Sequence, residues 1–302
     1  RRQRQMCIRD SLNQEQVAKK IPHINVNGRY PVLGALLQRR AGTARHDAVA
    51  WGYARAAENL GVDIIQNCEV KGIDVSNGKV VGLQTTKGAV KVDKVGLVPA
   101  GHSSVLANMA GFSLPINSVP LQALVSEPVK PILDCVIMSN SVHVYVSQSD
   151  KGELVVGAGS DAYNSYSQRG SFDMIEHMMA PLVELFPIFS RLKMLRSWGG
   201  IVDVTPDRSP IIGKTPVKDL FINCGWGTGG FKATPGSAHV FAETVFKGEP
   251  NDIAAPFSID RHFSGALVDE AAAAAVAPVS YTHLTLPTKR IVKISVVAVS
   301  LK

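Results

Sequence analysis

A glycine-rich loop between an apolar strand and a helix is the feature that most constrains how this chain can fold. Four glycines lie within the six positions from Gly225 to Gly230. A backbone without Cβ atoms can lie flat against a planar ligand. An apolar run at 219–223 precedes the loop and a helix is expected at about 234–246, which is the order in which backbone N–H groups approach a cofactor. The segment favours a nucleotide-binding domain, although glycine-rich loops before helices also serve as plain turns.

A second stretch has the pattern of a helix followed by a strand. Apolar residues from Val49 to Ala57 recur at helical spacing, and Gly61 stands where helices commonly end. The apolar run 62–66 then predicts a strand. Together with the extended apolar run before them, these residues predict a β–α–β-like passage.

A β-meander is expected next. Short β-branched runs fill 69–98 and are separated by the turn dipeptides Asn77-Gly78 and Lys87-Gly88. The last run leads into Ala100-Gly101, a turn of small residues. The meander indicates a small sheet beside the nucleotide-binding elements.

The order of these elements predicts an α/β (α+β) fold with two domains. A Rossmann-like nucleotide-binding domain is expected from 11–115 and 196–268, with a β-rich domain from 116–195 inserted between them.

The two ends of the chain have a pattern that does not belong to a fold. One choice of codons for residues 1–10 has a reverse complement that translates into residues 279–288, residue for residue. The same DNA tag joined to both ends of a fragment produces this relation. We therefore expect residues 1–10 and 279–302 to be non-native tails that lie outside the core.

The ends also distort the charge of the chain. Residues 1–10 and 279–302 together account for the whole formal charge of +7, so the remainder is close to neutral. The basic pI is therefore no indication of nucleic acid or an anionic membrane as a partner. Cys68, Cys135 and Cys224 are too widely spaced for a metal cluster or a disulfide framework and indicate a reducing compartment. With no apolar run of membrane-helix length, the expectation is a cytoplasmic protein without a metal site.

The glycine-rich loop takes on a more specific meaning from what precedes it. Trp198-Gly199-Gly200 and Thr205-Pro206-Asp207-Arg208-Ser209-Pro210 come before the loop, and this succession resembles the D-amino-acid-oxidase-like flavoprotein family. The resemblance implies bound FAD, with the flavin against Gly227, Thr228, Gly229, Gly230, Phe231 and Lys232.

The resemblance also assigns residues of the meander. It implies that Val70 meets the adenine through its backbone and that Ala100 and Gly101 approach the pyrophosphate or ribityl chain. Without the family, these residues would form an ordinary meander, and Lys232 would be an ordinary solvated lysine.

A branch of the same family is indicated by three further stretches. Residues 34–55, 145–152 and 195–200 closely resemble the beta subunits of heterotetrameric sarcosine oxidases. This resemblance implies oxidative demethylation of sarcosine to glycine, formaldehyde and hydrogen peroxide, in a complex with alpha, gamma and delta subunits. It further implies that Lys232 binds the substrate carboxylate and that His46 carries a covalent FMN. By itself, a histidine before a helix is more often a cap or a surface residue.

One departure from the family is large. The N-terminal Gly-x-Gly-x-x-Gly turn that holds the pyrophosphate is absent. We attribute this to truncation before the first βαβ unit, so the FAD-binding domain is expected to be incomplete and the chain inactive alone. Two alternatives stay open: an FAD-dependent oxidase or dehydrogenase of another N-methyl or secondary amino acid, and a non-catalytic assembly subunit that keeps the fold.

Overall fold

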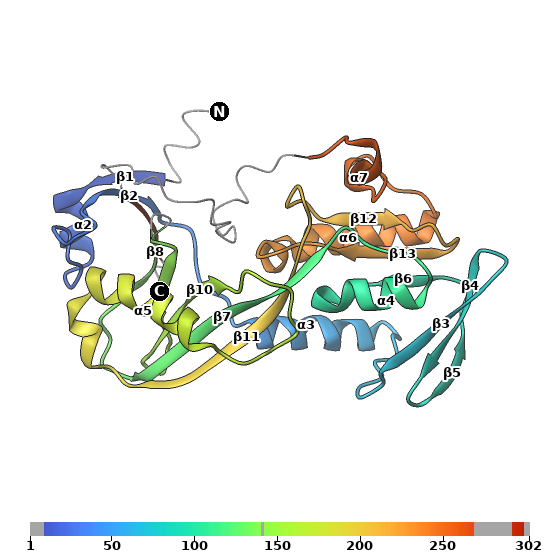
Figure 1. The fold of residues 1–302 in the computed structure, drawn as a ribbon, viewed down its shortest axis with the longest axis horizontal. Helices are drawn as coiled ribbons and strands as arrows, with labels where there is room; N and C mark the ends of the chain where they lie inside the picture. The colour runs from blue at the N-terminus through green and yellow to red at the C-terminus, as the bar shows by residue number, and fades with distance from the viewer. Residues whose placement is uncertain (1–8, 140–141, 269–291, 299–302) are drawn as a thin grey trace.

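The computed structural model describes residues 9–139, 142–268 and 292–298. Figure 1 shows two units: a large curved sheet with helices on one side, and a layered unit of two small sheets and several helices. Strand β11 (Met194–Val204) runs from the first unit into the second. The predicted mixture of helices and strands is confirmed.

The large sheet has eight strands in the order β1-β2-β14-β8-β9-β10-β7-β11. Its other strands are β1 (Arg9–Asn13), β2 (Val32–Gln38), β7 (Asn117–Pro128), β8 (Cys135–Ser139), β9 (Val144–Gln148), β10 (Glu153–Ser160) and β14 (Val292–Ala298). The helices α2 (Gln14–Lys20), α5 (Phe172–Leu185) and η2 (Pro187–Arg191) accompany it.

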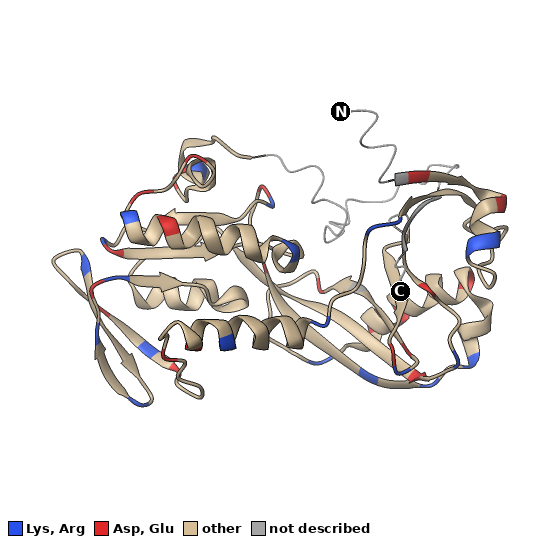
Figure 2. Ribbon diagram, turned by 180° about the vertical axis from the view of Figure 1, so that it is seen from behind, with Lys and Arg blue, Asp and Glu red and all other residues tan. Residues whose placement is uncertain are grey.

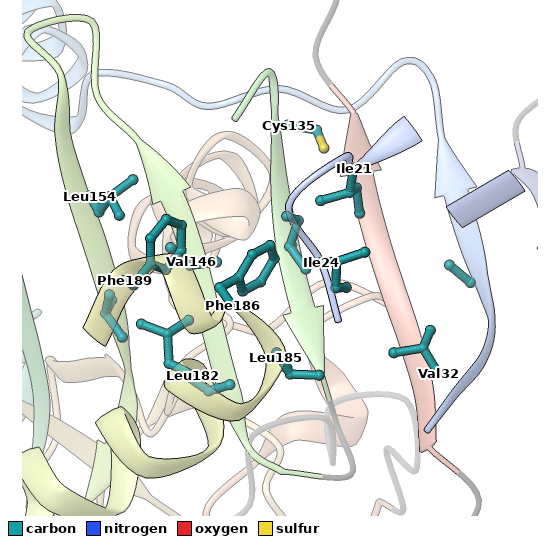
Figure 3. Close-up of a cluster of buried hydrophobic side chains, with 14 of the residues drawn as sticks. Ile21, Ile24, Val32, Cys135, Val146, Leu154, Leu182, Leu185, Phe186 and Phe189 are labelled. Atoms are coloured by element: carbon teal, nitrogen blue, oxygen red, sulfur yellow. The ribbon is translucent and has the colours of Figure 1, made fainter. Parts of the chain in front are cut away.

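The core of this unit lies between the sheet and α5 (Figure 3). On α5, the buried residues Met178, Leu182 and Leu185 recur at helical spacing, so one face of the helix is apolar. Beyond the helix, the rings of Phe186 and Phe189 stack with their centroids 5.0 Å apart. These side chains close the core over the sheet.

The start of the chain belongs to the same core, which corrects the expected domain boundary. Asn13 caps α2 through a reciprocal pair of bonds with Gln16, and the helix then buries Val17. Val32 of β2 is buried in the same cluster. Residues 9–38 therefore lie with the expected inserted domain, and not with the nucleotide-binding elements, because their apolar side chains fill the core of the large sheet.

The expectation that both ends lie outside the fold is also wrong for part of them. Asp10 pairs with Leu37 in the β1–β2 ladder. Strand β14 pairs parallel with β2 and antiparallel with β8. The run 291–297 is rich in β-branched residues, which suit a strand. Without β14, the facing edges of β2 and β8 would have unpaired backbone groups. Residues 1–8, 279–291 and 299–302 of the expected tails lie outside the described part of the chain.

The second unit contains two three-stranded sheets. One, in the order β12-β13-β6, is formed by β6 (Val95–Leu97), β12 (Ile211–Lys214) and β13 (Leu220–Cys224). The other, in the order β3-β4-β5, is the predicted meander of β3 (Val70–Ser76), β4 (Lys79–Thr85) and β5 (Gly88–Lys91). The helices are α3 (His46–Asn59), η1 (Ala100–His102), α4 (Ser103–Met109), α6 (Gly230–Lys247), η3 (Ala255–Phe257) and α7 (Arg261–Ser264).

The predicted helix at 47–59 is confirmed as α3, but the strand expected at 62–66 is not formed. None of the residues of α3 is buried. Val62, Ile64 and Ile65 are also exposed. An apolar run becomes a strand only when a neighbouring strand pairs with it, and no described strand lies beside 62–66.

A buried ion pair fastens α7 to the turn before β12. Arg261 donates to both carboxylate oxygens of Asp207, at 2.7 and 3.0 Å, and its side chain is 3% exposed. The same guanidinium donates to the carbonyl oxygens of Ser209, Phe257 and Ser258. Burial alone would raise the pKa of Asp207, but the hydrogen bonds from Arg261, Val268 and Ser209 outweigh it and hold the pKa well below its usual range.

Charged residues of both signs are interspersed along the described chain (Figure 2). In the ranges that the structure describes, no helix is long and apolar enough to cross a membrane.

Replacing Arg261 by Ala should be strongly destabilising. The change leaves Asp207 buried without its cation, which costs about 3–5 kcal/mol of unfolding free energy. The exposed pair Lys214–Glu249 offers a control, because Lys214→Ala should change the unfolding free energy by no more than about 1 kcal/mol. Urea unfolding measures both, and a similar small loss in the two variants would contradict the structural role of Arg261.

Candidate active site

The two segments predicted to face a cofactor follow two parallel strands. Strands β6 and β13 pair in parallel, with Leu220 opposite Val95 and Ile222 opposite Leu97. The carboxyl ends of parallel neighbours meet at one edge of a sheet, where ligands bind in open α/β folds. Ala100-Gly101 after β6 and the glycine-rich loop after β13 therefore lie at the same edge.

The end of β11 supports both segments. A Cβ at Gly101 would lie 2.5 Å from Ile201 of β11, so the turn can approach the strand only with glycine at that position. Two residues further along β11, the carbonyl oxygen of Asp203 accepts a hydrogen bond of 2.8 Å from Gly227 N. Trp226 forms an isolated bridge with Val204. The two loops thus contact the same short stretch of one strand.

The glycine-rich loop needs glycine for its backbone conformation at two positions. Gly225 and Gly227 have φ angles of +73° and +50°, in the left-handed region that favours glycine. The indole N–H of Trp226 donates to Asn223 at 2.6 Å, which turns the tryptophan back onto the end of β13.

Helix α6 starts at Gly230, four residues before the predicted start. Phe231 and Lys232 therefore lie in the first turn of the helix, and not in the loop, while Thr228 precedes it as an exposed turn residue. The side chain of Lys232 is exposed, and its ammonium makes no ion pair or hydrogen bond with any other residue that the structure describes. Its ammonium group is accordingly free to bind an anion.

Several backbone positions around the loops face open space. A Cβ at Gly200 or Gly236 would meet no atom within 4 Å, and at Gly229 the nearest is Trp226 O at 3.4 Å. Ala100 has a φ of +49°, which is strained for a residue with a side chain and occurs often at functional sites. Exposed glycine backbone beside a strained turn is the surface that a flat ring system requires, so these residues fit FAD.

A buried polar cluster under the two loops was not anticipated from the sequence. Asp203 is 4% exposed, and Ser118 Oγ donates to its Oδ1 at 2.9 Å. Burial raises the pKa of this carboxyl, against the opposing effects of Ser103, Ser118 and His102. Cys224 of β13 is also near, and burial is the largest cause that raises the pKa of its thiol to about 12. In the sequence, the only local sign of a buried acid at this position is that Asp203 stands between Val202 and Val204.

The large sheet also contributes to this region. The rings of His102 and Tyr166 stack with their centroids 4.9 Å apart. Tyr166 lies in the segment between β10 and α5, and Ser165 N of the same segment bonds to Ser118 O. The segment thus connects the large sheet to the turn after β6.

The other predicted cofactor residues are placed on separate elements. Val70 begins β3 and packs against the core of the second unit. His46 is the exposed first residue of α3. Beside it, Arg45 Nη1 lies 3.7 Å from Asp150 Oδ2. The backbone N–H of Ala48 donates to Asp47 Oδ1, and this hydrogen bond lowers the pKa of Asp47. Among the described residues, no group of three or more His, Cys, Asp or Glu is arranged to hold a metal ion.

The sequence as a whole identifies the family. A family model described as FAD dependent oxidoreductase (DAO) matches residues 1–244. The chain belongs to this family. The predicted fold class is confirmed by the match and by the fold itself.

Within the FAD dependent oxidoreductases, the chain is similar to three sarcosine oxidase beta subunits. It is 59% identical over 264 residues to that of Rhodobacter capsulatus, covering 87% of this chain and 64% of the relative. The identity is 58% over 268 residues for Arthrobacter sp, covering 88% and 66%, and 52% over 255 residues for Rhizobium meliloti, covering 84% and 61%. The chain thus spans less than two thirds of the length of these relatives.

Solved structures share the fold at low identity. L-proline dehydrogenase from P. horikoshii has a TM-score of 0.77 and 24% identity, over 86% of this chain and 70% of its own. Glycine oxidase from Geobacillus kaustophilus has a TM-score of 0.72 and 22% identity, over 84% and 67%.

Replacing Gly101 by Ala should displace the turn after β6. The new methyl group would meet Ile201 at 2.5 Å, and such overpacking costs about 1–3 kcal/mol of unfolding free energy. Gly200→Ala, next to Ile201 on β11, adds a methyl group to open space and should leave thermal stability unchanged. Calorimetry of both variants is the measurement, and equal melting temperatures would show that the turn is not held against β11.

Proposed function

We propose that this chain forms part of a flavin-dependent enzyme that oxidises sarcosine to glycine and formaldehyde, with oxygen reduced to hydrogen peroxide. The observation that carries the proposal is an unpaired lysine next to a glycine-rich loop. Lys232 is exposed in the first turn of α6, directly after the backbone suited to a flavin. Identities of 52–59% to sarcosine oxidase beta subunits support the choice of substrate.

The residues of this chain bind and orient the substrate. Bound FAD would supply the redox chemistry by accepting hydride from the N-methyl carbon. Gly227, Gly229 and Gly230 would face the ring with backbone only, and Ala100 and Gly101 would approach the rest of the cofactor from β6. Lys232 would hold the substrate carboxylate by a charge-assisted hydrogen bond, so that the N-methyl group points to the ring.

We further propose that His46 carries a covalent FMN and that α3 contacts another subunit. A neutral imidazole nitrogen is a nucleophile, and His46 is exposed with Arg45 beside it to favour a phosphate. Trp51 and Tyr53 of the same helix are 57% and 50% exposed. Exposed aromatic side chains on a helix without buried residues are typical of surfaces that bind another protein. The alpha, gamma and delta subunits of a sarcosine oxidase are the proposed partners.

Replacing Lys232 by Ala in the assembled enzyme should mainly weaken sarcosine binding. A charge-assisted hydrogen bond of about 1.5–3 kcal/mol corresponds to a rise of roughly 10- to 150-fold in KM or in the Kd of a carboxylate inhibitor. Lys247→Ala is the matched control, because Lys247 lies at the other end of α6 and pairs with Glu243. Steady-state kinetics and inhibitor titration report the difference. Unchanged constants in Lys232→Ala would remove this residue from the site.

The covalent attachment predicts flavin on this chain after denaturation. The assembled complex is denatured in acid, its subunits are separated, and the fluorescence of each band is recorded. Flavin should stay with this chain in the wild type and be lost in His46→Ala. His23→Ala controls for the loss of an exposed histidine elsewhere. Attachment that survives His46→Ala, or a bound FMN that is released entirely by acid, would show the assignment to be wrong.

A further inference from the structure

The buried acid under the two loops has an unusual set of neighbours. Asp203 Oδ1 accepts a hydrogen bond from Ser118 Oγ. Its Oδ2 is buried and has no hydrogen-bond partner among the residues that the structure describes. A buried oxygen without a partner costs free energy, and an ionised one costs far more.

A nearby hydroxyl has already used its proton elsewhere. The Ser103 hydroxyl is among the groups that act on the Asp203 carboxyl. Its single proton is already donated to Ala100 O, at 2.6 Å. A hydroxyl with its proton used has only lone pairs left to offer. If Asp203 were a carboxylate, it and the Ser103 oxygen would both be acceptors and could not bond to each other. A carboxylic acid at Asp203 would supply the missing donor.

The charges around Asp203 do not compensate an ionised form. On η1, His102 is the titratable group that acts on it. His102 is exposed and stacked on Tyr166. On β13, Cys224 has a thiol pKa of about 12 and is neutral over the ordinary range. Arg261 acts on Cys224, but its guanidinium is bound to Asp207. No described cation bonds to Asp203 itself.

We propose that Asp203 is a positioning residue held as a neutral carboxylic acid, with its Oδ2–H donating to Ser103 Oγ. The resulting chain of bonds runs from Ser118 through Asp203 and Ser103 to Ala100 O, in the turn after β6. The backbone oxygen of Asp203 accepts from Gly227 N in the other loop. One residue thus fixes both loops without placing a negative charge beneath them. That the loops face a flavin rests on the proposed function, while the protonation of Asp203 does not.

The protonation is tested directly by infrared spectroscopy of the full chain, with aspartate labelled by ¹³C at the carboxyl carbon. At neutral pH the wild type should show the carbonyl stretch of a protonated carboxylic acid, and Asp203→Asn should lack it. Because the band is read from the wild type, the test stands even when the variant folds poorly. Absence of the band in the wild type overturns the proposal.

The dependence of stability on pH gives a second, independent test. In the unfolded state the carboxyl of Asp203 ionises above pH about 3.8, whereas in the folded state, where its pKa is raised, it stays protonated to higher pH. Its contribution to stability therefore falls as pH rises from about 3.8 to the folded-state pKa. Asp203→Asn should remove this fall and be no less stable than the wild type at neutral pH. Asp203→Ala should be less stable at every pH, because it loses the hydrogen bonds.

Asp207→Asn is the matched control with the opposite sign. The pKa of Asp207 is lowered, so its contribution is present above the unfolded value and lost as pH falls. This variant should therefore lose stability at neutral pH. His102→Asn should keep the fall in stability that the wild type shows, which separates the titration of Asp203 from that of His102. If Asp203→Asn loses stability at neutral pH as Asp207→Asn does, Asp203 is ionised and the proposal is wrong.

A flavin readout separates the positioning role from the proposed function. In the assembled enzyme, Asp203→Asn should retain the flavin absorbance spectrum and Asp203→Ala should shift it or lower the flavin content. A spectrum unchanged in Asp203→Ala overturns the positioning role. If the wild-type enzyme does not oxidise sarcosine while it and the Asp203 variants bind flavin as expected, the proposed function is contradicted and the role of Asp203 stands.

Discussion

The parallel pairing of β6 with β13 is the constraint on which the candidate site depends. These strands are separated by more than a hundred residues, yet the ladder from Val95–Leu220 to Leu97–Ile222 brings their carboxyl ends together. Each strand then delivers a loop to one edge: η1 from β6, and the glycine-rich loop with α6 from β13. Without this pairing the two loops would be unrelated turns.

Local patterns predicted the elements but not their assignment to units. The helix α3, the meander and the strand–loop–helix passage have spacings and turn residues that are read within a dozen positions. The membership of β1, α2 and β2 in the large sheet depends on contacts with residues more than a hundred positions away, such as Leu182 and Phe186. Such contacts leave no periodic trace in the sequence. The strand expected at 62–66 failed for the same reason, because pairing is a property of neighbours.

In the candidate site too, the sequence predicted the local loop but not the contacts between distant residues. The glycine-rich loop is visible because glycine is needed where φ is positive, as at Gly225 and Gly227. Asp203 was missed because its bonding partner Ser118 is 85 positions away and both residue types are common on surfaces. The one usable signal was an acid between two valines in a run that otherwise reads as a strand. A buried acid of this kind has to be neutral or paired.

Strand β11 also acts as a spacer of fixed length. Its pairing with β7 runs from Met194 to Val204, and its last residues contact Gly101, Ser118 and Gly227 in turn. Side chains alternate between the two faces of a strand, so one added or deleted residue reverses every later position. Asp203 would then turn away from Ser118, and the residue opposite Gly101 would change. We therefore expect an added or deleted residue to be tolerated in the exposed β4–β5 hairpin and to disrupt the site when it falls within β11.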